Sequence, residues 1–117
     1  MEPHNDTIVW VTSEGERASE GRRLLQSAGL HVVIITHAEE IPSACREHKP
    51  QILMIGSTVQ PAEKRRIWAT ARNSCDTTLV ELGSDGIPEV AQTSYFVDPE
   101  PPSEFVRRLK QIMKFRA

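Results

Sequence analysis

Short apolar runs alternate along this chain with longer stretches in which apolar residues recur at helical spacing. Five runs are rich in aliphatic and aromatic residues and have the length of buried strands, at residues 7–11, 31–36, 51–55, 77–82 and 94–97. The stretches between them predict helices at about residues 13–28, 38–48 and 61–73, and a last helix from Ser103 onward. Residues 87–92 leave room for at most a turn or two of helix.

Residues at the ends of the predicted helices support this division. Ser13 followed by Glu16 fits a capping box, so the first helix should open there, and Gly29 supplies the expected stop. Pro42 falls in the first turn of the second helix, where a missing N–H is tolerated. Ser103 can act as the N-cap of the last helix.

The alternation predicts a single α/β domain. Continuous apolar strands indicate a sheet that is covered on both faces, and parallel strands need right-handed crossovers. We therefore expect a three-layer sandwich with a five-stranded parallel sheet in the order 2-1-3-4-5, spanning residues 1–117 with a core at about 7–114. In such a sheet ligands bind at the carboxyl ends of the strands. The third run ends there in Gly56-Ser57-Thr58, without an acid.

Composition narrows the classes of protein to consider. The 117 residues carry a net charge of −2, so no basic excess points to nucleic acid. The N-terminus is polar and acidic, unlike a signal peptide, and no apolar run is long enough to cross a bilayer. We therefore expect a cytoplasmic protein without membrane contact. Cys45 and Cys75 have no metal-type spacing and are expected to be free, buried thiols.

Three short segments carry a resemblance to a known family. They are Leu24-Leu25-Gln26-Ser27-Ala28-Gly29-Leu30-His31-Val32, Lys49-Pro50-Gln51-Ile52-Leu53-Met54-Ile55 and Tyr95-Phe96-Val97-Asp98-Pro99. Together with the strand–helix order over residues 7–114, they resemble the receiver domain of bacterial two-component response regulators. The resemblance implies a phosphoryl-accepting aspartate at the end of the third strand. It also implies two acids that hold Mg²⁺, and a Thr or Ser and a Lys that bind the phosphoryl oxygens.

The residues at those positions do not carry that chemistry. The acid pair corresponds to Thr12 and Ser13, the acceptor to Gly56 or (counting from Pro61) Ser57, the hydroxyl to Leu82 and the lysine to Asp98. An aspartate in place of the lysine would repel a phosphoryl group. We therefore interpret the chain as a degenerate receiver, or pseudo-receiver, that is not an enzyme and uses no cofactor or metal. The span from Leu82 to Tyr95 is also short, which predicts a stunted fourth helix.

Two hypotheses about function follow. The first is a phosphorylation-independent signalling domain of a two-component or phosphorelay pathway, which binds a kinase, a regulator or its own output domain. The alternative is a small-molecule sensor of flavodoxin-like topology, with an uncharged crevice at the strand ends. A third class, the cysteine phosphocarriers of this topology, does not fit. These enzymes need a cysteine just after the first strand, and this chain has Thr12 and Ser13 there.

Several surface residues have both a functional and a structural interpretation. Trp68, Tyr95 and Phe115 are candidates for an interface, and Phe115 would pack locally, on a dimer mate or against the rest of a longer protein. If the chain belongs to a longer protein, we expect it to be the N-terminal domain. Lys64, Arg65, Arg66 and Arg72 give the third helix a basic face, which is expected to face solvent unless an acidic partner binds it.

The polar residues at the strand ends and the histidines could form binding sites or be ordinary loop and surface residues. Ser13, Ser57, Thr58 and Asp98 could form a polar pocket, although loop hydroxyls usually cap backbone groups and an Asp before Pro is usually a turn residue. Asp98 could also bind a cation together with Ser84 or Asp85. The histidines at positions 31, 37 and 48 are expected to be too scattered for a metal site.

Overall fold

The computed structural model of the chain describes residues 6–13, 15–83 and 95–116. The strands are β1 (Thr7–Val11), β2 (His31–Ile35), β3 (Ile52–Ile55), β4 (Thr78–Leu82) and β5 (Tyr95–Val97). The helices are α1 (Gly15–Ser27), the short 3₁₀ helix η1 (Ala38–Glu40), α2 (Ile41–His48), α3 (Pro61–Ser74) and α4 (Pro102–Arg116). In these described ranges no helix combines the length and apolar character that a membrane crossing requires.

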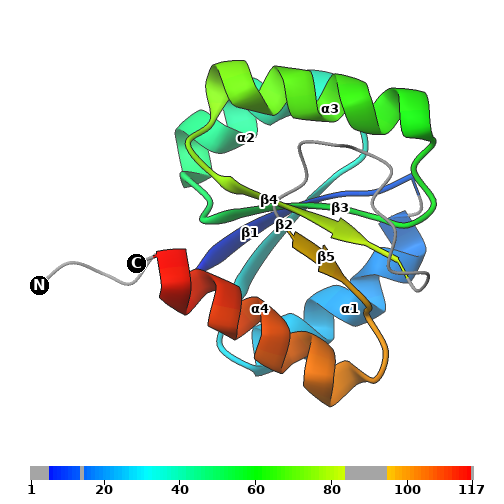
Figure 1. Ribbon diagram of the computed structural model, residues 1–117, viewed down its shortest axis with the longest axis vertical. Helices are drawn as coiled ribbons and strands as arrows, with labels where there is room; N and C mark the ends of the chain where they lie inside the picture. Colours follow the sequence, from blue (N-terminus) through cyan, green and yellow to red (C-terminus); the bar gives the residue numbers. More distant parts are fainter. Residues whose placement is uncertain (1–5, 14, 84–94, 117) are drawn as a thin grey trace, which may run out of the picture.

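The five strands form one parallel sheet in the order β2-β1-β3-β4-β5, as predicted. Figure 1 shows α2 and α3 on one face of the sheet and α1 and α4 on the other, which completes the three layers. Alternate residues of each strand enter the two cores. Trp10 and Met54 pack on the side of α1 and α4, whereas Val11 and Ile55 pack on the side of α2 and α3.

The predicted boundaries hold to within a residue or two at most ends. Gly29 follows α1 with a φ of 91°, so the glycine stop is confirmed. The last helix begins at Pro102, one residue before Ser103, so the prediction that Ser103 is its N-cap is wrong. Proline suits the first helical position because its missing N–H would have no partner there anyway. The predicted turn of helix at residues 87–92, and with it the stunted fourth helix, lies outside the described residues.

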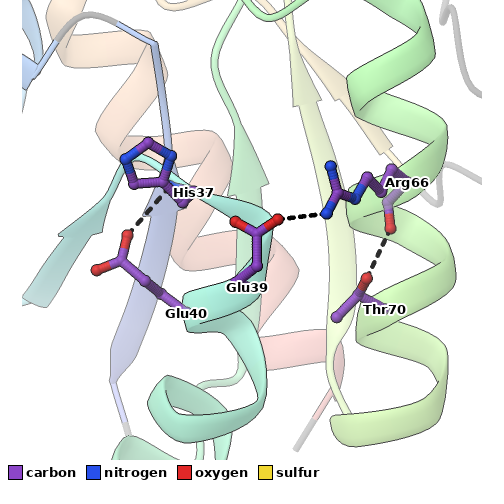
Figure 2. Close-up of polar contacts among 5 residues, drawn as sticks. All are labelled: His37, Glu39, Glu40, Arg66 and Thr70. Atoms are coloured by element: carbon purple, nitrogen blue, oxygen red, sulfur yellow. Dashed lines mark hydrogen bonds and ion pairs between the residues drawn. The ribbon is translucent and has the colours of Figure 1, made fainter.

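A polar cluster connects η1 to α3. Glu40 Oε2 accepts hydrogen bonds from the backbone N–H of Thr36 and His37, at 3.2 and 3.1 Å, and so caps the 3₁₀ turn. The exposed side chain of Arg66 pairs with Glu39, and Thr70 donates to the backbone carbonyl of Arg66 (Figure 2). Part of the predicted basic face of α3 is therefore neutralised within the molecule.

The prediction of two free thiols is wrong. Cys45, in the last turn of α2, forms a disulfide with Cys75 at the end of α3, and their Cα atoms lie 5.5 Å apart. The two residues are 30 positions apart in the sequence, and only the side-by-side packing of α2 and α3 brings them together. Spacing along the chain carried no sign of this pairing.

Candidate functional site

The carboxyl ends of the strands place three of the predicted site positions at one level. Val11, Ile55 and Glu81 are paired across β1, β3 and β4, so Thr12, Gly56 and Leu82 follow side by side. The backbone N–H of Gly56 donates to the carbonyl of Val11 at 2.8 Å, which continues the parallel ladder by one residue. Asp98 lies one residue beyond this level, because Leu82 pairs with Val97.

A cavity of about 130 Å³ opens at this edge, on the side of the sheet that α1 and α4 cover. Its wall consists of Trp10, Thr12, Ala18, Gly56, Ser57, Thr58, Leu82 and Pro99. None of these side chains is charged. The cavity therefore offers hydroxyl groups and apolar surface, and the charge that phosphoryl chemistry requires is missing from the part of its wall that the structure describes.

Trp10 forms the inner part of this wall. Its side chain is buried, and its indole Nε1 has no hydrogen-bond partner among the described residues. A buried donor without a partner costs about 1–3 kcal/mol, so such groups are rare in folded proteins. The edge of the ring contacts α1: a Cβ added at Gly21 would lie 2.6 Å from Cη2 and 2.7 Å from Cζ3. This contact fixes the indole and explains why α1 carries a glycine on its inner face.

Two of the hydroxyl groups at this edge of the sheet are hydrogen-bonded to each other. The hydroxyls of Ser13 and Thr58 lie 2.7 Å apart and share a hydrogen bond, which ties the loop after β1 to the loop after β3. Ser13 was expected to cap the first helix, but α1 begins two residues later, at Gly15. The structure thus brings together three of the four residues of the predicted polar pocket, Ser13, Ser57 and Thr58.

Asp98 does not line the cavity. Its side chain is exposed, and Oδ1 accepts a hydrogen bond from the backbone N–H of Glu100 at 2.9 Å. This is the behaviour of a turn residue before proline, so the structural interpretation of Asp98 is confirmed. Ser84 and Asp85, its suggested partners for a cation, lie outside the described residues.

Comparison with known proteins shows which fold this is. No family model matches the chain, and no curated protein does. Among solved structures, the receiver domain of RstA from Klebsiella pneumoniae has a TM-score of 0.76 and 17% identity, covering 92% of this chain and 98% of that one. The receiver domain of Francisella response regulator 1452 has a TM-score of 0.76 and 10% identity, covering 95% of this chain and 98% of that one.

This chain has the receiver-domain fold. The same fold occurs in a chain described as a pilus assembly protein, CpaE from Burkholderia thailandensis, with a TM-score of 0.72 and 21% identity. That match covers 92% of this chain and 98% of the other. The receiver fold therefore occurs in neighbours that are described in different functional terms.

The receiver fold implies a Mg²⁺ ion at the strand ends, and the residues described here do not fit one. Mg²⁺ prefers carboxylate oxygens, whereas the positions that would hold it carry Thr12, Ser13 and Gly56. Glu14 lies outside the described residues. Within the described ranges no group of three His, Cys, Asp or Glu side chains is placed to hold a metal ion.

A buried ion pair on the opposite face of the sheet was not predicted from the sequence. Lys64 of α3 and Glu81 of β4 form a salt bridge of 3.1 Å, with side chains that are 1% and 0% exposed. The prediction that Lys64 belongs to a solvent-facing basic surface is therefore wrong. The sequence did contain a sign of this burial, because Lys64 has the helical spacing that places it on the same face of α3 as the buried residues Ile67 and Ala71.

The candidate interface residues differ in exposure. Trp68 is half-buried and packs against the core beneath α2 and α3, so it does not form an exposed patch beside Ile67. Tyr95, at the start of edge strand β5, is 40% exposed and is the one exposed large hydrophobic residue in the described ranges. The side chain of Phe115 lies outside what the structure describes.

Two of the histidines are closer than the sequence suggested. The rings of His31 and His48 have centroids 6.0 Å apart, at the amino end of β2 and the end of α2. His37 follows the opposite end of β2. Two rings at this distance do not contradict the expectation that the three histidines are too scattered for a metal site.

Proposed function

We propose that this chain is a receiver-like signalling domain that accepts no phosphoryl group and acts by binding another protein. The observation that carries the proposal is the uncharged wall at the strand ends, where Thr12, Gly56 and Leu82 stand side by side. Phosphoryl transfer needs a nucleophilic carboxylate and cations that neutralise the developing charge. The described cavity wall supplies neither.

A protein partner is the function that remains for a receiver scaffold without its chemistry. The partner would be a kinase, a regulator or an output domain of the same protein, within a two-component pathway in the cytoplasm. Tyr95 supports an interface on β5, because an exposed aromatic ring on an edge strand offers both apolar area and unpaired backbone groups. On this proposal the domain has no enzymatic activity of its own.

The first half of the proposal is tested with phosphoryl donors and analogues. The ¹⁵N-labelled protein is incubated with Mg²⁺ and acetyl phosphate, and separately with Mg²⁺ and beryllofluoride, beside a phosphorylatable receiver as the positive control. We expect no change in its amide spectrum or intact mass, whereas the positive control responds. Shifts concentrated at Gly56 and Ser57, or an added phosphoryl mass, would overturn the proposal.

The second half is tested by capture of a partner with matched surface variants. The full-length gene product is used as bait in its native cell, alongside Tyr95→Ser and Arg65→Ser, which both change exposed residues. We expect wild type and Arg65→Ser to retain one protein at defined stoichiometry and Tyr95→Ser to lose it. Equal retention by all three baits would remove β5 from the interface, and the absence of any specific protein would contradict a binding role.

A further inference from the structure

The buried indole N–H of Trp10 is a donor that the described protein leaves unused. The side chain is only 8% exposed, and Nε1 has no hydrogen-bond partner. Buried donors of this kind are nearly always paired, either with protein or with a bound molecule. The residue also lines the cavity at the strand ends, so a partner from outside the chain would approach it there.

Gly56 determines where such a partner would lie. A Cβ built on Gly56 would be 3.2 Å from Thr12 Oγ1 and 3.5 Å from Trp10 Nε1. Thr12 Oγ1 and Trp10 Nε1 therefore both face the point where a side chain of residue 56 would begin, and a methyl group there would be in tight contact with Thr12. A ligand oxygen has to stay at van der Waals distance from the Cα of Gly56, so it would approach Nε1 from the cavity side, where residue 56 has no side chain in the way.

We propose that this cavity binds a small uncharged organic molecule through an oxygen that accepts a hydrogen bond from Trp10. A carbonyl or similar oxygen would lie in front of Gly56, and the apolar part of the molecule would rest against Leu82 and Pro99. The volume of about 130 Å³ is close to that of a cavity known to admit benzene, so a single ring is the expected size.

Charge defines the class of ligand more closely. A buried carboxylate or phosphate needs a cation nearby, and among the described residues no lysine, arginine or histidine lines the cavity. A cationic ligand would need a carboxylate in the wall, and the part of the wall that the structure describes contains none. The site therefore favours neutral molecules over charged ones of the same shape. This inference does not depend on which protein the domain binds.

Trp10 itself reports binding. The chain has two tryptophans, so its ¹H–¹⁵N spectrum holds two indole signals, which a Trp68→Phe variant assigns. The wild-type chain is titrated at millimolar concentration with three neutral carbonyl compounds: benzamide, cyclohexanone and 2-pyrrolidinone. Benzoate is the charged match of benzamide, and toluene is the match that lacks the acceptor. We expect saturable downfield movement of the Trp10 indole signal with at least one carbonyl compound, and about tenfold weaker binding of benzoate and toluene.

A substitution then places the ligand. Gly56→Ala puts a methyl group between the two donors and should weaken binding by about tenfold or more. Thr36→Ala is the matched control, because Thr36 lines only the neighbouring hollow of about 430 Å³, which shares Thr12 and Thr58 with the cavity. The comparison of ligands uses only the wild-type chain, so it stands even if Gly56→Ala does not fold.

Three outcomes would overturn the proposal. They are an unmoved Trp10 indole signal with all three carbonyl compounds, binding of benzoate as tight as that of benzamide, and unchanged binding by a folded Gly56→Ala variant. Shifts confined to residues around Thr36 would place the ligand in the other hollow and would also reject the site at Trp10.

Discussion

At the scale of single residues, Lys64 and Glu81 are the side chains whose environment departs most from their chemistry. Both charged groups are fully buried, and they form an ion pair of 3.1 Å. Removing one partner takes the ion pair away from a charge that stays buried, so Lys64→Met or Glu81→Gln should lower the free energy of unfolding by about 3–5 kcal/mol. The double variant Lys64→Met/Glu81→Leu should recover most of that loss. Urea denaturation of the three variants measures both effects.

Arg66 supplies the matched control for this prediction, because it is also a cation of α3 in an ion pair, but with a 58% exposed side chain. Arg66→Met should change the free energy of unfolding by no more than about 1 kcal/mol, since exposed pairs contribute little. Equal effects at Lys64 and Arg66 would show that the buried pair does not carry the stability assigned to it here.

At the scale of elements, the alternation of apolar runs was sufficient to predict the sheet, its order and the two helical layers. Those features depend on local periodicity and on general rules for parallel sheets, which a single sequence displays. The pairing of Cys45 with Cys75 depends instead on how α2 and α3 lie beside each other, which no local pattern encodes. The burial of Lys64 was only partly predictable. Its helical spacing with Ile67 and Ala71 places it on the buried face of α3, but a charged side chain is usually expected to face solvent.

The disulfide makes a prediction for the helical layer that contains it. A cross-link across 30 residues restricts the unfolded chain, so its reduction should lower the free energy of unfolding by about 2–4 kcal/mol. Urea denaturation with and without a phosphine reductant measures the change, and a Cys45→Ala/Cys75→Ala variant should not respond to the reductant. A titration that finds two free thiols in the unfolded, unreduced protein would contradict the bond.

At the scale of the whole molecule, the chain has the receiver fold, and on our proposal uncharged residues stand where a working receiver carries its charges. The function of such a framework depends on residues that four strands bring to one edge of the sheet, and the sequence could locate those positions through the strand ends. It could not reveal the unpaired indole N–H of Trp10 or the space in front of Gly56. Both arise from the packing of α1 on the sheet, which is a property of the assembled layers.

If only the charges are missing, then restoring two of them should restore cation binding. Thr12 and Gly56 lie side by side at the ends of β1 and β3, so Thr12→Asp/Gly56→Asp places two carboxylates at one edge. We expect this variant to bind Mg²⁺ in the millimolar range, followed by amide shifts of the loops after both strands, because Mg²⁺ selects carboxylate oxygens. The wild-type chain and the uncharged match Thr12→Asn/Gly56→Asn should not bind. Equal Mg²⁺ binding by the wild type, or none by a folded aspartate pair, would show that the framework at this edge differs from that of a working receiver.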